Sequence, residues 1–215
     1  VGADLSGIEL RMLAHYLGRY DGGRYADILL NDDIHQVNAD KIGITRRQVK
    51  TVTYAFLYGA GNEKLGMSYD NSLQPTKARK KGQEIREAFV AAIDGLSDLL
   101  AAISIKLAER GYLVACDGRR VLVDSPHKAL NYLLQCSAGI VAKRWMVIAN
   151  DRLQPFHTHQ LAFVHDELQY ECRPYHAVGV RRELETSAIL AGEYYQLRCP
   201  IAAEAKEGPT WADVH

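Results

Sequence analysis

Two short apolar runs, each leading to an aspartate, constrain the fold of this chain most strongly. Near the start, Gly2-Ala3-Asp4-Leu5 is typical of the end of a strand, and apolar residues recur at helical spacing directly afterwards. Farther along, residues 161–172 predict two short strands joined by a tight turn that carries His165 and Asp166. A carboxylate that ends a buried strand is held rigidly. We therefore expect both aspartates to point into a cleft.

Most of the remaining chain has helical periodicity. The pattern predicts helices at about 46–58, at 77–110 with a break near 94–95, at 125–152 and at 175–195, with a hairpin at 113–123 and a last strand at 201–205. Residues 62–76 show no such pattern, and we expect a loop there. The chain is therefore predicted to be α+β, with a small antiparallel sheet, helices packed on one side and a helical, basic insertion.

Composition narrows the class of protein further. The 215 residues, 47% of them hydrophobic, fit one substantial domain or two lobes that share a core. No apolar run approaches the roughly 20 residues of a membrane helix, and the start lacks a signal peptide. It also lacks a methionine, so we expect part of a longer protein. The four cysteines are widely spaced and form no CxxC pair, which favours a reducing, intracellular setting over a zinc site.

Charge is distributed unevenly although the net charge is zero. Residues 41–86 contain ten basic and three acidic residues, whereas residues 1–40 contain three basic and seven acidic ones, and residues 151–215 six basic and ten acidic. A basic lobe beside an acidic region suits a polyanion held near metal-binding carboxylates. A solvated surface of Lys and Arg accounts for the charges equally well.

Asp4 and Asp166 are candidates for a divalent metal site. Two carboxylates brought together repel each other unless cations lie between them. Mg²⁺ suits hard oxygen ligands and substrate phosphates, and a pair of ions supports phosphoryl transfer. The plainer interpretation is that Asp4 caps a helix and Asp166 stabilises a turn.

The helix expected at 46–58 has one cationic and aromatic face. Arg46, Lys50, Tyr54 and Tyr58 are each four residues apart and form one gently winding stripe, while the opposite side is apolar. The cations could hold a triphosphate and the rings could pack on a sugar and a base. An ordinary amphipathic surface helix would show the same pattern.

Three segments resemble the motifs of family A DNA polymerases, in the order in which the family carries them. Residues 4–11 resemble motif A, residues 46–59 motif B and residues 164–168 motif C. Further segments at 117–119, 125–127 and 207–211 look closest to replicative polymerases of podovirus-type phages. The resemblance covers nearly the whole chain. It implies a DNA-directed DNA polymerase, a nucleotidyltransferase that adds deoxynucleotides to a primer 3′-end.

The resemblance implies a role for each matching position at the metals and the nucleotide. Asp4, Asp166 and the backbone carbonyl of Leu5 would bind two Mg²⁺ ions, and Lys50 would also donate a proton to the leaving pyrophosphate. The residues implied to contact the incoming dNTP are His35, Arg46, Lys50, Tyr54 and Glu9, the last as a steric gate against a 2′-hydroxyl. His35 could instead only cap or pack near the turn at Asp32 and Asp33.

Other matching positions would lie along the nucleic acid. Tyr58 would stack near the templating base, and Gly59 would permit close approach. The residues implied to lie at the template or primer are Tyr58, Gly59, Asn131, Gln135, His165 and Glu167. Of these, Glu167 would sit close to the metals without being an obligatory ligand, and Gln135 could be an ordinary exposed helix residue.

The resemblance also implies a domain organisation. Residues 1–34 and 113–215 would form the palm and residues 35–112 the fingers, with the thumb and exonuclease domains upstream and absent here. The implied partners are primer-template DNA, dNTPs and a processivity factor acting through the upstream region, with no membrane. The setting would be the cytoplasm, that of the host cell if a phage encodes the chain.

Three alternatives remain open at this stage. A single-subunit RNA polymerase shares the palm chemistry, although Glu9 and Glu167 favour DNA synthesis. A primer-template DNA-binding fragment that is inactive without its thumb needs only the basic lobe, and its binding would weaken steeply with salt. A metal-dependent nuclease would leave the stripe from Arg46 to Tyr58 unexplained.

Overall fold

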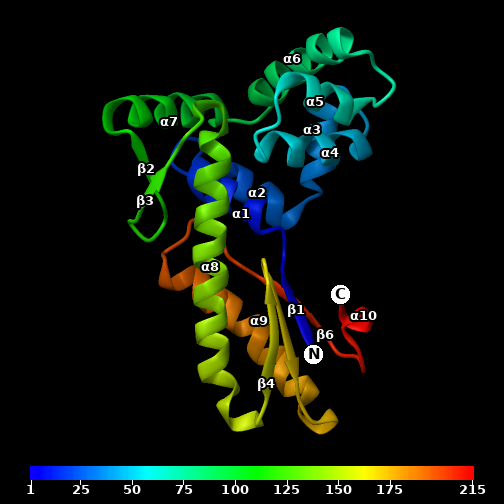
Figure 1. The fold of residues 1–215 in the computed structure, drawn as a ribbon, viewed down its shortest axis with the longest axis vertical. Coiled ribbons are helices and arrows are strands. Elements are labelled where there is room, and N and C mark those ends of the chain that lie inside the picture. The colour runs from blue at the N-terminus through cyan, green and yellow to red at the C-terminus, as the bar shows by residue number, and fades with distance from the viewer. The chain divides into compact units, whose positions relative to one another are not determined.

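The computed structural model describes residues 1–215, which divide into two compact units (Figure 1). The first unit comprises residues 1–12 and 136–215, and the second comprises residues 13–135. Two helices, α1 (Ile8–Leu17) and α8 (Ala129–Leu153), contribute to both units. No single helix is both long and apolar enough to cross a membrane, and one bent pair, residues 75–92 with residues 96–110, passes that test only by combined length and composition.

The first unit is built on a four-stranded antiparallel sheet with the strand order β4-β5-β1-β6. The strands are β1 (Gly2–Leu5), β4 (His159–Val164), β5 (Glu167–Glu171) and β6 (Ala203–Lys206). The unit's further helices are α9 (Ala177–Tyr194), α10 (Trp211–Val214) and the short 3₁₀ turns Gln154–Phe156 and Pro174–His176. The predicted strand pair and the two predicted long helices are confirmed to within a few residues.

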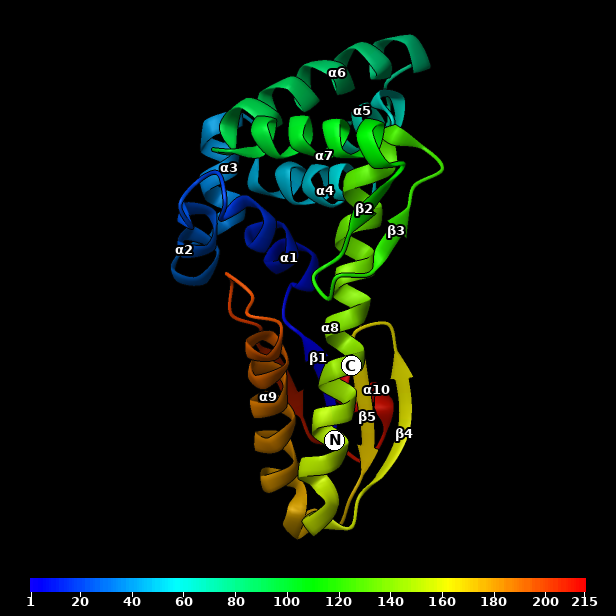
Figure 2. The same cartoon turned by 90° about the vertical axis from the view of Figure 1, so that its left-hand side faces the viewer.

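Strand alternation in β1 separates the core from the functional face. Ala3 and Leu5 are buried, whereas Asp4 between them is exposed. Figure 2 shows α9 and the C-terminal half of α8 running alongside the sheet. These two helices are joined by Trp145 on α8, which is fully buried and donates its indole N–H to the carbonyl of Leu184 on α9 at 2.8 Å. The sheet is thus anchored on one face, and Asp4 is left on the other.

The second unit is mainly helical. Besides parts of α1 and α8, its elements are α2 (Arg24–Asn31), α3 (Ile34–Ile42), α4 (Arg46–Leu57), α5 (Asn62–Tyr69), α6 (Pro75–Ala92), α7 (Leu96–Arg110), the hairpin β2 (Tyr112–Val114) with β3 (Arg120–Leu122), and the 3₁₀ turn Pro126–Lys128. The predicted break near residues 94–95 is confirmed, since α7 begins after Gly95, whose φ of 77° lies in the left-handed region. The α+β class is confirmed.

The predicted loop at 62–76 is wrong, because residues 62–69 form α5. This helix has little apolar periodicity of its own and is stabilised by close packing on α6. A Cβ added at Gly66 would lie 1.9 Å from the carbonyl oxygen of Ala78, and one at Gly82 would lie 1.8 Å from that of Asn62. Two glycines therefore let the two backbones approach, which helical spacing in the sequence does not reveal.

Candidate active site

Strand pairing in the first unit brings the two predicted aspartates together. The backbone N–H of Leu5 donates to the carbonyl oxygen of Asp166 at 3.0 Å. Asp4 is the direct cross-strand partner of Glu167 on β5. Cross-strand partners point to the same face of a sheet. One corner of the sheet, which we call the acidic corner, therefore carries Asp4, Asp166 and Glu167, although Asp4 is far from the other two along the chain.

The carboxylates of this acidic corner perturb one another. Burial and then the neighbouring charges of Asp166 and Glu167 raise the pKa of Asp4 from 3.8 to about 6. Burial, followed by the charges of Glu9 and Glu167, also raises the pKa of Asp166. Asp4 keeps solvent contact along part of its side chain, so both burial and repulsion act on it. The predicted steric-gate residue Glu9, in the first turn of α1, thus belongs to the same corner.

The turn that carries Asp166 is conformationally unusual. His165 is exposed at the tip between β4 and β5, and its φ of 57° lies in the left-handed region that residues with a side chain seldom occupy. Val164 and Glu167 pair across this turn. An unusual backbone conformation at an exposed side chain is a reason to look for a function there.

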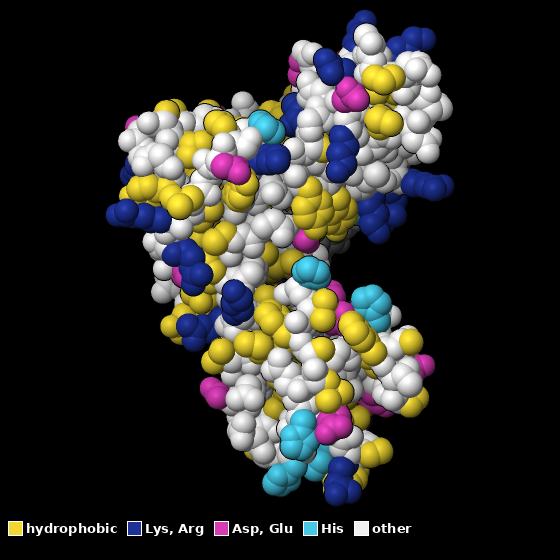
Figure 3. Space-filling model, viewed as in Figure 1, with side chains coloured by type: hydrophobic (Ala, Val, Ile, Leu, Met, Phe, Trp, Pro, Cys, Tyr) yellow, Lys and Arg dark blue, Asp and Glu magenta, His cyan; other side chains and the backbone are white.

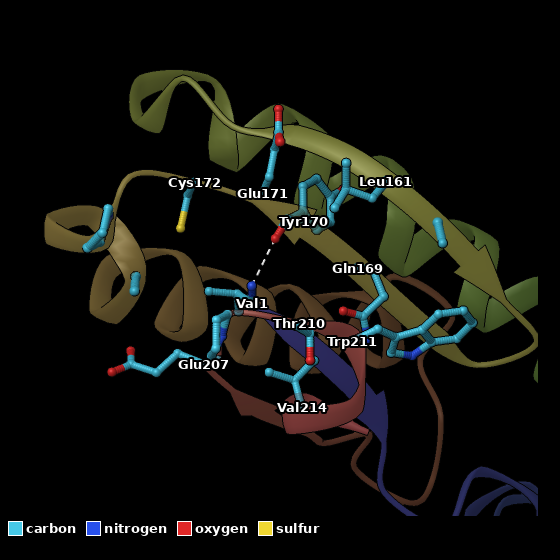
Figure 4. Close-up of a pocket in the computed structure, with 15 residues that line it drawn as sticks. Val1, Leu161, Gln169, Tyr170, Glu171, Cys172, Glu207, Thr210, Trp211 and Val214 are labelled. Atoms are coloured by element: carbon cyan, nitrogen blue, oxygen red, sulfur yellow. Dashed lines mark hydrogen bonds between the residues drawn. The ribbon is translucent and has the colours of Figure 1, made fainter.

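Glu167 differs from the other acidic residues because it is buried, with 5% relative exposure. Its Oε1 accepts the indole N–H of Trp211 at 2.7 Å and also the side-chain amide of Gln169. Its Oε2 lies 3.0 Å from Nδ1 of His215. Figure 4 shows Gln169 and Trp211 side by side. Trp211 was predicted only as part of a resembling segment, and nothing in the sequence indicated His215.

The acidic corner fits Mg²⁺ bound in the manner of a phosphate-processing site. No group of three or more His, Cys, Asp or Glu side chains is arranged to hold a metal ion by itself. Mg²⁺ is usually bound by one or two carboxylates together with substrate phosphates. Asp4 and Asp166 offer such a pair, and burial followed by neighbouring negative charges raises the pKa of both carboxyl groups, an effect that a bound cation would oppose.

In the second unit, α4 carries the predicted cationic and aromatic face. Thr45 caps the helix in a reciprocal capping box with Gln48. Arg46 and Lys50 are exposed and Tyr54 is partly exposed. The opposite face is buried, through Val49, Val52, Thr53, Phe56 and Leu57. The amphipathic arrangement inferred from the four-residue spacing is confirmed.

His35 lies beside this face. Asp33, which caps α3, accepts the backbone N–H of His35 at 3.1 Å and pairs with Nε of Arg46 at 2.5 Å. The rings of His35 and Tyr54 are 6.2 Å apart. Burial lowers the pKa of His35, and the charges of Arg46 and Lys50 lower it further against the opposing charge of Asp33. His35, Arg46, Lys50 and Tyr54 therefore gather at one place.

Two features leave this cluster open to a ligand. Nδ1 of His35 is buried and has no hydrogen-bond partner. Lys50 is exposed and forms no ion pair. A buried polar atom without a partner is costly, and a ligand or water that bonds to it would recover that cost. Figure 3 shows further Lys and Arg side chains spread over α4 to α6 on this face of the second unit.

The remaining predicted positions also lie in the second unit. Tyr58 ends α4 and is 50% exposed. Gly59 has a φ of 73°, and a Cβ there would lie 3.2 Å from Cγ of Lys128, so both conformation and space favour glycine. Asn131 and Gln135 are one turn apart on α8, and Gln135 is exposed.

The fold is that of a polymerase domain. It matches the solved structure of the POL domain of Pol1 from M. smegmatis, which is in complex with DNA primer-template and dNTP, with a TM-score of 0.81. That match covers 99% of this chain and 40% of the other chain at 22% sequence identity, so it bears on the fold alone.

The chain belongs to DNA polymerase family A, whose sequence profile matches residues 1–213. It is 34% identical to the DNA-directed DNA polymerase of Escherichia phage T7 and 33% identical to that of Enterobacteria phage T3, with all of this chain covered in both cases. It is 28% identical to DNA polymerase I of Mycobacterium tuberculosis over 97% of the chain. The chain spans about a third of the length of the phage relatives, 33% in each. The predicted family is confirmed.

Proposed function

We propose that this chain is the catalytic palm-and-fingers portion of a DNA-directed DNA polymerase. The observation that supports this most is the electrostatic coupling of Asp4 on β1 with Asp166 in the turn that precedes β5. In this proposal residues 1–34 and 113–215 form the palm and residues 35–112 the fingers. Primer-template DNA and dNTPs are the substrates, and a processivity factor acts through an upstream region. The reaction takes place in the cytoplasm, that of the host cell if a phage encodes the chain.

Asp4 and Asp166, together with the backbone carbonyl of Leu5, would hold two Mg²⁺ ions. When bound, these ions would supply a more acidic primer 3′-hydroxyl and charge stabilisation for the transferred phosphoryl group and the leaving pyrophosphate. The protein's own contribution is rigid positioning, because Asp4 lies in the ladder between β1 and β5 and the carbonyl of Asp166 accepts the backbone N–H of Leu5. His165 at the turn would support the primer terminus, and Glu167 would sit close to the ions without being an obligatory ligand.

The triphosphate would be bound by the cluster around α4. Arg46 and Lys50 offer cationic donors, and the neutral imidazole favoured by burial of His35 offers a hydrogen bond without an added charge. Arg46 would exchange its present partner Asp33 for a phosphate. Lys50 would also protonate the leaving pyrophosphate.

Nucleotide selection would depend on two further positions. Tyr54 would lie against the sugar, and Glu9 would crowd a 2′-hydroxyl, so that deoxynucleotides are preferred. This preference separates the proposal from an RNA polymerase of the same palm chemistry. Tyr58 with Gly59 would contact the templating base, and Asn131 with Gln135 would read the minor groove of the duplex.

Primer extension tests the proposal. The chain is incubated with a primed template, dNTPs and Mg²⁺, beside Asp166→Asn and an exposed-surface control, Asp151→Asn. We expect template-dependent extension by the unmodified chain and by Asp151→Asn. We expect a loss of about 100- to 1,000-fold in Asp166→Asn, the scale on which electrostatic catalytic groups act. DNA binding without extension would support the binding-fragment alternative. Degradation of DNA without nucleotides would support a nuclease.

A further inference from the structure

The acidic corner contains a carboxylate that is close enough to join the metal site but is held by other groups. Glu167 directly follows Asp166 and is the cross-strand partner of Asp4. Its charge raises the pKa of both aspartates, so it lies within electrostatic range of each. Three neighbouring carboxylates would ordinarily make a strong cation site. In this structure they do not form a metal-binding group, and Glu167 is contacted by other side chains instead.

Three donors engage both oxygens of Glu167. Trp211 and Gln169 donate to Oε1, and Nδ1 of His215 lies at hydrogen-bond distance from Oε2. Hydrogen bonds to an ionised carboxylate are about twice as strong as neutral ones. A cation that recruited Glu167 would have to displace donors from two side chains at the C-terminal end of the chain. These contacts therefore occupy both oxygens of the carboxylate.

The contacts of Trp211 and His215 do more than attach α10 to the sheet. The helix has its own anchors, because Val214 is buried and Thr210 forms a capping box with Asp213. Trp211 is 50% exposed, and the side chain of His215 is 71% exposed. Burial of apolar surface alone therefore does not account for their placement. What both residues share is a polar atom aimed at Glu167.

We propose that Trp211 and His215 form a clamp that keeps Glu167 out of the metal coordination sphere, so that the site offers two carboxylates rather than three; this rests on the proposed function. Fewer anionic ligands lower the affinity for a divalent cation. The clamp thereby leaves coordination positions on the cation for substrate phosphates. Cation binding that supports the reaction then depends on nucleotide binding. Trp211 and His215 are in this sense positioning residues that act through Glu167.

Binding of Mn²⁺ alone, measured by electron paramagnetic resonance without DNA or nucleotide, tests the clamp. Trp211→Phe combined with His215→Ala removes the two donors at the C-terminal end, frees Oε2 of Glu167 and leaves only the Gln169 amide on Oε1. It also retains an aromatic ring at the exposed position. We expect Mn²⁺ to bind about five- to tenfold more tightly than to the unmodified chain, because the freed Glu167 adds a third anionic ligand. The same pair of substitutions in a Glu167→Gln background should leave the affinity close to that of Glu167→Gln alone.

Controls separate the clamp from general damage and from failure of the proposed function. Trp145→Phe removes an indole hydrogen bond in the same unit that does not touch an acidic residue, and it should leave Mn²⁺ affinity unchanged. Unchanged or weaker binding in the clamp variant overturns the clamp, as does equal tightening in the Glu167→Gln background. If Asp166→Asn does not reduce Mn²⁺ binding by the unmodified chain, the proposed metal site itself fails and the clamp fails with it.

Discussion

Repulsion at the acidic corner should make Asp166→Asn more stable than the unmodified chain when no divalent cation is present. The substitution removes a charge that raises the pKa of Asp4, together with the cost of ionising Asp166 itself. Asparagine has nearly the same size and can keep the backbone contact to Leu5. A gain in stability at the expense of activity is typical of a strained functional site.

The pKa shift of Asp4 sets the scale of the expected change in the free energy of unfolding. A rise from 3.8 to about 6 corresponds to roughly 3 kcal/mol at about 1.4 kcal/mol per pKa unit. Burial of Asp4, the largest cause of the pKa shift, remains in Asp166→Asn, and screening at the partly exposed side chain reduces the contribution of the Asp166 charge further. We therefore expect Asp166→Asn to raise the free energy of unfolding by about 1 kcal/mol.

The stability difference between Asp166→Asn and the unmodified chain depends on pH. With both pKa values raised in the folded state, the folded chain binds more protons than the unfolded chain between about pH 4 and pH 6, so the free energy of unfolding falls as pH rises through that window. The advantage of Asp166→Asn should therefore be present at pH 8 and absent at pH 4.

Urea denaturation followed by circular dichroism measures this difference, with Asp151→Asn as the matched control on an exposed helical surface. Added Mg²⁺ should stabilise the unmodified chain at pH 8 more than it stabilises Asp166→Asn. Equal stability of the two chains at pH 8, or a loss in Asp166→Asn, would refute the reasoning about repulsion.

Three further predictions concern the second unit. Lys50→Gln should raise the KM for dNTP about tenfold or more in a steady-state extension assay, whereas Lys64→Gln on α5 should not, and equal effects would contradict the phosphate role. Gly82→Ala should lower the free energy of unfolding by about 2 kcal/mol or more in urea titrations because its Cβ would overlap a carbonyl of α5, whereas Gly139→Ala, with nothing within 4 Å, should leave stability unchanged or higher. Thr45→Ala should cost about 1 kcal/mol in the same measurement through loss of the capping box on α4, and an unchanged midpoint would contradict it.

Local patterns in the sequence account for most of the fold. Long amphipathic helices such as α4 and α9 follow from helical spacing, and the strands around Asp166 follow from a short apolar run with a turn. The helix α5 was missed because its stability depends on Gly66 and Gly82 at a contact with α6. A glycine inside a sequence pattern indicates a break far more often than close helix packing.

In the candidate site, too, local patterns predicted some residues, whereas others are brought together only by tertiary packing. Family resemblance and strand-end position identified Asp4 and Asp166, and the four-residue spacing identified the face of α4. The ion pair between Asp33 and Arg46 and the contacts of Glu167 joined residues that no local pattern connects. Such contacts arise from tertiary packing, so they could not be predicted from one sequence.

Anomalous scattering from crystals of the chain with primer-template DNA, a non-hydrolysable dNTP and Mn²⁺ tests the central claim most directly. The account predicts Mn²⁺ peaks bound jointly by the carboxylates of Asp4 and Asp166, with Glu167 still bonded to Trp211. Mn²⁺ found only at other residues, with Asp4 and Asp166 free of it while nucleotide is bound, would contradict the account.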